Sequence, residues 1–380
     1  MMAAFADLPA ELIHHIVSIL ALQESPSSRY LHEEPSILLL DSVHRPLKNL
    51  SRTCRVLHDH CFPCLFSALK ANIQDTSNFA AFVQQHVLIE NVKSLVIYSM
   101  KSNNRTLING SPRNDNSFNI STWPLVLSLL DQINPRSLTF VLPPAAYEDL
   151  LPYKLALEDD WAFNISYQVL HLKQSLDDTQ SSSTAIPTTT PNIFLARPWN
   201  HMTFNEGSSI PAYCTYEYFH KNTPSLLMSQ QIWLFPINMS AQITSFDLVG
   251  IFPMDISSAC TFLIGVRSLR RLRTQLAPGA SNHIMDDSRS LGKCQREDLW
   301  SEFAQCYRTL SFVIKQGQSQ GTYAQLEQFV ALDYAITGLR DIIDRSVILE
   351  PSEWDFDDHG CWIRIRRHSS IDSHADSNIT

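Results

Sequence analysis

The sequence is poor in glycine, and this scarcity excludes the usual loops that bind phosphate. Only 10 of the 380 residues are glycine, and no two of them are spaced as Gly-x-Gly. Phosphate-cradling loops need closely spaced glycines, because backbone N–H groups must approach the ligand. The sequence also lacks a Gly-x-Ser-x-Gly elbow and a His-Glu-x-x-His helix. These absences remove common signatures of nucleotide-dependent enzymes, serine hydrolases and zinc peptidases.

Long apolar runs and a secretory leader are also missing. No apolar stretch approaches the roughly 20 residues that cross a membrane, so we expect no membrane partner. The opening residues MMAAFADLPAELIHH lack the basic start and the uninterrupted apolar core of a signal peptide. We therefore expect a soluble protein of the cytoplasm or nucleus, in which the eight cysteines stay reduced.

Basic charge is scarce as well. The chain has 29 Lys and Arg residues against 38 Asp and Glu residues, which gives a formal net charge of -9. Proteins that track the nucleic-acid backbone usually carry a basic stripe. The two short basic runs, Arg267–Arg273 and Arg364–His368, are more simply interpreted as a solvated face or a strand end. The sequence therefore predicts no nucleic-acid partner.

The best candidate metal ligands are His58, His60, Cys61 and Cys64. The two cysteines have zinc-knuckle spacing, but a second ligand pair at a typical interval is missing. Cys61 also falls on a core position of a helical pattern, which favours buried thiols and surface imidazoles. The acidic residues in 350–358 lack the glycine and the closing glutamate of a calcium loop. We expect neither a metal ion nor another cofactor.

Apolar residues at helical spacing dominate the first 70 residues. The first apolar face lies in residues 8–20, and its members are Leu8, Leu12, Ile13, Ile16, Val17 and Leu20. Pro9 and Glu11 suit the first turn of this helix. Residues 21–44 are less regular and are interpreted as an insertion or extended loop.

Helical spacing returns after this insertion. The apolar steps are Leu47, Leu50, Cys54, Leu57, Cys61, Leu65 and Leu69. Pro63 is expected to break or kink the run, because proline removes a helical hydrogen bond. The pattern predicts two or three short helices that end near Ala71.

These residues resemble the F-box family. The matching pieces are Leu8-Pro9 with Glu11 and Leu12, then Ile16 and Leu20, then LSRTCRVLHDHC at 50–61, and finally Leu65-Phe66. Phe66 stands where the family often has an aromatic residue such as Trp. The resemblance covers residues 8–66 and departs from the usual pattern at the insertion, residues 21–44.

The resemblance implies a three-helix unit that binds the Skp adaptor of SCF-type ubiquitin ligases, and through it a cullin. The residues that it implies for this contact and its supporting core are Leu8, Pro9, Glu11, Leu12, Ile16, Leu20, Leu50, Leu57, Leu65 and Phe66. An apolar face on so small a unit is costly in water, which favours a permanent protein partner. The alternative is that these helices pack on the chain's own C-terminal domain.

Beyond residue 75, short β-rich segments alternate with helical segments. The expected strands are 92–100, 136–142, 164–172, 201–204, 243–252 and 360–367. The expected helices are 78–88, 123–133, 255–272, 296–316 and 322–344. The polar segments 101–119 and 175–191 are expected to be mobile loops.

The predicted fold class is mixed α/β. The resemblance implies an F-box at residues 1–75, and we expect a larger α/β domain at 76–367 and a disordered tail at 368–380 to follow it. The strand centres recur at irregular intervals, so the larger domain is either an irregular leucine-rich-repeat-like solenoid or a compact α/β domain.

The larger domain weakly resembles the C-terminal regions of uncharacterised fungal F-box proteins. The features are LVGIFP at 248–253, the Leu276-Ala277-Pro278 turn and Asp298-Leu299-Trp300. The expected function is recruitment of an unknown protein substrate to a cullin ubiquitin ligase, without catalytic residues. The alternatives are a scaffold that binds the Skp adaptor without a ligase role, and an unrecognised enzyme domain at 76–367.

Overall fold

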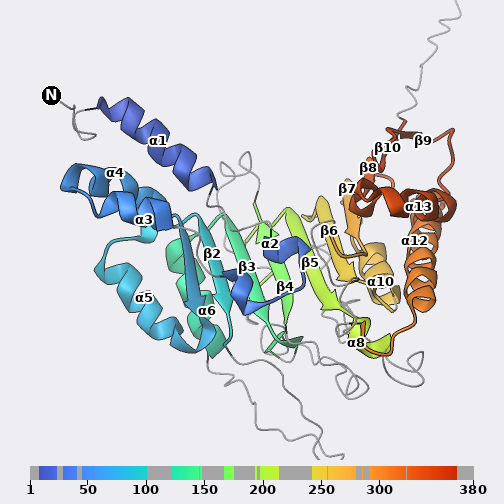
Figure 1. The fold of residues 1–380 in the computed structure, drawn as a ribbon, viewed down its shortest axis with the longest axis horizontal. Helices are drawn as coiled ribbons and strands as arrows, with labels where there is room; N and C mark the ends of the chain where they lie inside the picture. Colours follow the sequence, from blue (N-terminus) through green and yellow to red (C-terminus); the bar gives the residue numbers. More distant parts are fainter. Residues whose placement is uncertain are drawn as a thin grey trace, which may run out of the picture.

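The computed structural model describes most of the chain. The described residues are 8–23, 29–40, 45–100, 122–144, 146–147, 167–174, 193–194, 197–213, 242–254, 256–279, 285, 291–321 and 323–365. They form a mixed α/β structure around a ten-stranded, mostly parallel sheet, which confirms the predicted class (Figure 1). The segments expected to be mobile, 101–119 and 175–191, and the tail at 368–380 lie outside the described residues.

The strands follow one another across the sheet almost in sequence order, β1-β2-β3-β4-β5-β6-β7-β8-β10-β9. Their bounds are β1 (Ala68–Asn72), β2 (Ser94–Tyr98), β3 (Ser137–Leu142), β4 (Gln168–Lys173), β5 (His201–Ser208), β6 (Ser245–Ile251), β7 (Arg271–Gln275), β8 (Gln328–Ala331), β9 (Trp354–Phe356) and β10 (Cys361–Arg364). β4 is antiparallel to both of its neighbours, and so is β10. The other neighbouring pairs are parallel.

The helices that connect the strands gather on one face of this sheet. They are α5 (Thr76–Gln85), α6 (Thr122–Ile133), α8 (Ile210–Tyr213), α10 (Ser257–Gly265), α12 (Arg296–Ser319) and α13 (Arg340–Ser346), with 3-10 turns η3 (Ile73–Asp75), η4 (Ile89–Asn91), η10 (Leu332–Ala335) and η11 (Thr337–Leu339). Crossovers between parallel strands are right-handed, so successive steps in one direction put the helices on the same side. We call this side the helix face.

A row of apolar side chains crosses the helix face in register. Its members, one from each strand from β2 to β8, are Leu95, Leu138, Leu172, Met202, Phe246, Leu272 and Phe329. All of them are buried in one core with side chains from the helices. Burial of each such side chain stabilises the fold by about 1.5–3 kcal/mol.

The N-terminal helices α1 (Ala10–Gln23), α3 (Arg45–Ser51) and α4 (Arg55–Leu65) form a small unit with its own core. The buried residues of that core are Ile13, Val17, Leu47, Leu57 and Cys61. Between α1 and α3 the chain leaves this unit, and α2 (Arg29–His32) and η2 (Ile37–Leu40) lie against the sheet (Figure 1).

The structure corrects several of the predicted elements. Pro63 lies inside α4, which continues to Leu65, so the proline does not break the helix although it gives up one backbone hydrogen bond. Leu69, expected on a helix, lies on β1. The expected helix 255–272 ends at Gly265, and β7 begins within its last residues. The expected helix 322–344 instead contains β8, two 3-10 turns and the start of α13.

Candidate functional site

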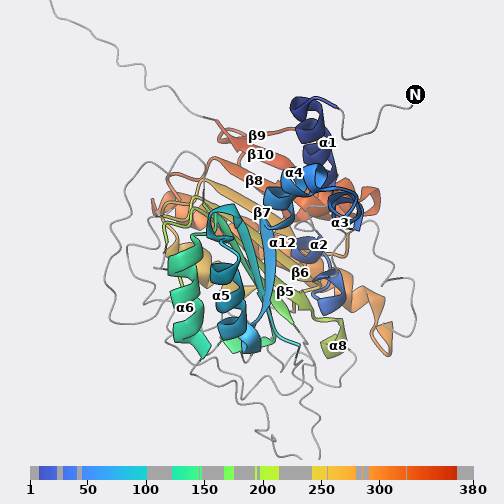
Figure 2. The same ribbon diagram turned by 90° about the vertical axis from the view of Figure 1, so that its left-hand side faces the viewer.

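The face of the sheet opposite the helix face carries rows of side chains in register, and we call it the polar face. Alternate residues of a strand point to the same side of the sheet. The register between strands then aligns one such residue from each strand into a row. Figure 2 places α5 and α6 on one side of the strands and α2 on the other. The polar face therefore differs from the helix face in both its chemistry and its covering.

Three rows make up the polar face. The donor row consists of Ser94, Ser137, Lys173, His201, Ser245, Arg271 and Gln328. The middle row consists of Val96, Thr139, His171, Thr203, Asp247, Arg273 and Val330. The covered row consists of Tyr98, Val141, Val169, Asn205, Val249 and Gln275.

The covered row holds the segment 29–40. Ile37 and Leu40 pack into an apolar cluster with Val141 and Val169. The side-chain amide of Asn205 donates hydrogen bonds to the backbone carbonyls of Leu31, at 3.2 Å, and Glu33, at 2.8 Å.

The neighbouring amide of Gln275 donates to the carbonyl of His32 at 2.9 Å, and its Oε1 lies 3.0 Å from His32 Nδ1. The segment thus crosses the strands from β7 toward β2. Its own backbone carbonyls accept hydrogen bonds from Gln275 on β7 and Asn205 on β5, and its apolar side chains pack on the strands farther along.

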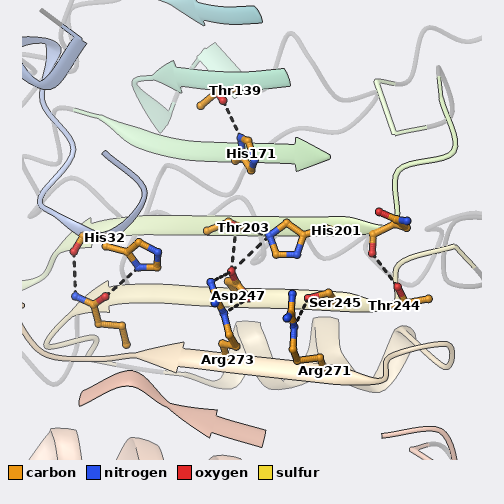
Figure 3. Close-up of polar contacts among 12 residues, drawn as sticks. His32, Thr139, His171, His201, Thr203, Thr244, Ser245, Asp247, Arg271 and Arg273 are labelled. Atoms are coloured by element: carbon orange, nitrogen blue, oxygen red, sulfur yellow. Dashed lines mark hydrogen bonds and ion pairs between the residues drawn. The ribbon is translucent and has the colours of Figure 1, made fainter. Parts of the chain in front are cut away.

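A buried carboxylate dominates the middle row. Asp247 is 1% exposed. Arg273 donates from Nε to Asp247 Oδ1 at 2.9 Å and from Nη2 to Oδ2 at 2.5 Å (Figure 3). Thr203 donates its hydroxyl to the same Oδ2 at 3.4 Å. A buried charge without a partner is strongly destabilising, so the ion pair with Arg273 stabilises this carboxylate in the interior.

Two histidines on neighbouring strands lie next to this ion pair. His171 Nδ1 is 2.8 Å from the hydroxyl of Thr139, and His201 Nε2 is 3.1 Å from the hydroxyl of Thr203. Burial lowers the pKa of His171 to about 3, and the nearby His201 and Lys173 act in the same direction.

Burial also lowers the pKa of His201 to about 4, although Asp247 partly opposes this effect. Both imidazoles are neutral at pH 7, and a base with so low a pKa removes protons poorly at that pH. The cluster is better suited to hydrogen bonding than to proton transfer.

The donor row is the accessible edge of the polar face. Lys173 is exposed, His201, Arg271 and Gln328 are half-buried, and Ser245 is buried. Arg271 Nε donates to Ser245 Oγ at 3.0 Å, which fixes the guanidinium across two strands. The row contains no carboxylate, and every member is able to donate a hydrogen bond. Its chemistry fits a ligand that is rich in acceptor atoms or negative charge.

A second buried polar cluster lies at the end of β7. Asp333 accepts hydrogen bonds from the backbone N–H groups of Leu276, at 2.6 Å, and Ala277, at 3.1 Å, and from the Tyr307 hydroxyl, at 2.6 Å. Burial raises the pKa of Asp333 to about 6, against the opposing effect of these hydrogen bonds. The cluster satisfies backbone donors where the strand ends, which is a structural role.

The residues that the F-box resemblance singles out divide into three groups. Leu57 is buried in the small N-terminal core, and Leu8, Leu20, Leu50 and Leu65 pack against it while partly exposed. Pro9, Glu11 and Leu12 are exposed, and Ile16 is intermediate. Phe66 packs instead on the main core, with its ring centroid 4.8 Å from that of Phe62.

The candidate metal ligands do not converge. Cys61 is buried in the small core, where burial raises the pKa of its thiol, and His60 Nδ1 lies 3.2 Å from His14 Nε2. Within the described ranges, no group of three or more His, Cys, Asp or Glu side chains could hold a metal ion. None of the helices in those ranges combines the length and apolarity needed to span a membrane.

The polar face is not among the features predicted from the sequence. The signal was present in β7, where Arg271 and Arg273 alternate with Leu272 and Thr274 at the period of a strand. The comparisons with known proteins add no further guidance: no protein-family model, no curated protein and no solved structure matches this chain. Its function is therefore inferred from its own residues.

Proposed function

We propose that this chain is a substrate-recognition adaptor of an SCF-type cullin ubiquitin ligase. In this proposal α1, α3 and α4 form an F-box that binds the Skp adaptor, and the sheet with its helices holds a protein substrate. The observation that carries the proposal is a second apolar stripe on α1, which faces away from the small core. The resemblance of residues 8–66 to F-boxes supplies the identity of the partner.

The second stripe is distinct from the first. Ile13 and Val17 are each 1% exposed and belong to the small core. Leu12 is 50% exposed and Ile19 is 43% exposed, and Ile16 lies between them on the same side of the helix. A surface helix normally has one apolar stripe and a polar opposite face. An additional apolar stripe supports a protein partner that covers it.

The sheet supports the second half of the proposal. Strands in sequence order with helices on one side are the arrangement of a leucine-rich-repeat-like solenoid, which we propose as the finer description of this domain. Such solenoids present their other surface to partners. Here that surface is the polar face, whose donor row contains accessible Lys173 and Arg271.

The proposed mechanism is proximity. An adaptor that holds the ligase with one surface and a substrate with another raises the effective concentration of the substrate near the transfer machinery. It needs no catalytic residue of its own. The ligase components that it would meet place it in the cytoplasm or nucleus.

The test replaces the second stripe in the full-length chain. The variant Leu12→Ala/Ile19→Ala should keep its fold and lose capture of purified Skp adaptor, because truncating exposed apolar anchors weakens binding and not folding. Leu125→Ala/Ile264→Ala is the matched control, since these side chains are 44% and 42% exposed on other helices. Equal capture by both variants, or no capture by the wild type, would contradict the assignment.

A scaffold without a ligase role would bind the Skp adaptor through the same stripe. The two functions separate in a reconstituted ligase. An adaptor supports ubiquitin transfer to a bound protein in a reaction that depends on the second stripe of α1, whereas a scaffold binds the same protein without transfer.

A further inference from the structure

The donor row offers a continuous set of hydrogen-bond donors on adjacent strands. From β4 to β8 its members are Lys173, His201, Ser245, Arg271 and Gln328. Neighbouring strands are about 4.8 Å apart, so these five positions span roughly 19 Å. The row has two formal cations and no anion, although the chain as a whole has a net charge of -9.

The two arginines of this face are held in place before any ligand arrives. Arg271 is fixed by Ser245, and Arg273 is fixed by Asp247. The Arg273–Asp247 pair is neutral as a unit, so Lys173 and Arg271 supply the excess positive charge. A donor that is already oriented loses less conformational entropy when it binds an anion.

The segment 29–40 demonstrates how this face holds a peptide. It crosses the strands from β7 toward β2, and side-chain amides of Asn205 and Gln275 grip its backbone carbonyls. The donor row runs parallel to it, two rows away along the strands. The same sheet surface therefore carries a second row of donors that a chain crossing the strands beside this segment would meet.

We propose that the donor row binds an extended acidic peptide segment, which crosses β4 to β8 beside the segment 29–40. An extended chain rises about 3.3 Å per residue, so about six residues cover the row. Carboxylates of the peptide meet the exposed Lys173 and the half-buried Arg271. This inference rests on the proposed function, because it names the class of substrate that the adaptor would recruit.

A peptide fits this surface better than a nucleic acid does. Single-stranded nucleic acids are held by a track of cations and by aromatic side chains on which bases stack. The donor row contains no Phe, Tyr or Trp. The net charge of -9 also repels a long polyanion, while a short acidic segment meets only the local field.

The experiment measures peptide binding to the full-length chain by fluorescence anisotropy. The probe is a labelled peptide of about six glutamates. A glutamine peptide of equal length and a short single-stranded RNA serve as competing classes of ligand. We expect the glutamate peptide to bind, to weaken with added salt and to be preferred over both. Stronger binding of the RNA, or equal binding of the glutamine peptide, would overturn the proposal.

Variants locate the site. Lys173→Gln/Arg271→Gln should weaken peptide binding at least about tenfold, equivalent to about 1.4 kcal/mol. Arg308→Gln/Lys315→Gln, on the helix face, should leave peptide binding unchanged. Arg308 is exposed, and Lys315 pairs with the exposed Glu350. Lys173→Gln alone, at an exposed position, keeps the test valid if the double variant unfolds. Equal affinities in all variants would overturn the proposal.

The outcome is separable from that of the proposed function. Capture of the Skp adaptor depends on Leu12 and Ile19, and peptide binding depends on Lys173 and Arg271. Loss of adaptor capture alone contradicts the ligase assignment and leaves the acidic-peptide site standing. Absence of peptide binding with intact adaptor capture contradicts the site alone.

Discussion

Arg273 and Asp247 form a two-point ion pair across strands β7 and β6, with both contacts at 2.9 Å or less. The carboxylate is 2% exposed and the guanidinium 30% exposed, so the pair joins the interior of the sheet to its surface. The charge of Asp247 cannot be hydrated by bulk water in this position. Its stability in the fold depends on the cation beside it.

Removal of Arg273 should therefore cost more than removal of the whole pair. Arg273→Met leaves a buried carboxylate without a counter-ion, and we expect a loss of about 2–5 kcal/mol in the free energy of unfolding. Arg273→Met/Asp247→Leu should lose less, because no buried charge is left unpaired. Urea unfolding of the single and double variants measures both. A double variant as unstable as the single one would contradict the account.

The pH dependence of stability should reflect the buried histidines. His171 has a pKa of about 3 in the folded protein and an unperturbed value of 6.5. The unfolded chain binds a proton below pH 6.5, while folded His171 stays neutral until about pH 3. Its contribution is thus present above pH 6.5 and is lost as pH falls, by roughly 2–3 kcal/mol at pH 4.5.

Variants isolate this effect from other titrations. Asp333, with a raised pKa of about 6 against 3.8, acts with the opposite sign: its stabilising contribution is present below pH 3.8 and is lost as pH rises through 6. The informative quantity is therefore the change in the free energy of unfolding per pH unit in each variant. Chemical unfolding between pH 7 and pH 4.5 should show a shallower loss for His171→Gln than for wild type. The exposed His86→Gln should leave the slope unchanged.

The domain boundary is the third prediction. The sequence placed it near residue 75, but β1, at Ala68–Asn72, pairs in parallel with β2 along five residues. We expect a fragment of residues 67–380 to unfold in one cooperative transition. A fragment of residues 76–380 should melt at a lower temperature, because β2 becomes an uncovered edge. Calorimetry of the two fragments compares them, and equal midpoints would show that β1 contributes nothing.

The sequence predicted the strands whose apolar residues form runs, and it missed those that are short or mixed. β2 and β6 are buried on both faces and stand out as apolar segments. β7 mixes polar and apolar residues, and β8 has only four residues. The expected helices 255–272 and 322–344 overlap them, so helical spacing masked both strands. The alternation in β7 indicates a polar side of that strand, but the rows of the polar face could not be predicted, because a row depends on the register between strands. Lys173 meets His201 only because β4 runs antiparallel to β5.

In the small N-terminal unit, too, the sequence pattern predicted the element but not its contacts. Helical spacing correctly grouped the apolar residues of α1, but it could not tell the inner stripe from the outer one. Ile13 and Val17 are buried while Leu12 is half exposed, although all three fit the same periodic pattern. Contacts with α3 and α4 determine which side of α1 faces the small core, and these helices lie more than twenty residues away in sequence.

The last prediction concerns the grip on the segment 29–40. Asn205 is fully buried and donates to the carbonyls of Leu31 and Glu33, and its Oδ1 accepts from the Gly207 N–H at 3.0 Å. Asn205→Ala removes both of these hydrogen bonds, and each contributes about 0.5–1.5 kcal/mol. We expect faster amide hydrogen exchange across 29–40 in this variant, with little change on the helix face.

A matched control is available on the helix side of the molecule. Gln84 is an exposed amide that donates to Gln132 at 2.6 Å, so Gln84→Ala removes a hydrogen bond without uncovering a buried carbonyl. It should leave exchange in 29–40 at the wild-type rate. The apolar contacts of Ile37 and Leu40 remain in both variants, so the release should be greatest near Leu31–Glu33. Exchange at the wild-type rate along the whole segment in Asn205→Ala would show that the apolar contacts, and not Asn205, hold it to the sheet.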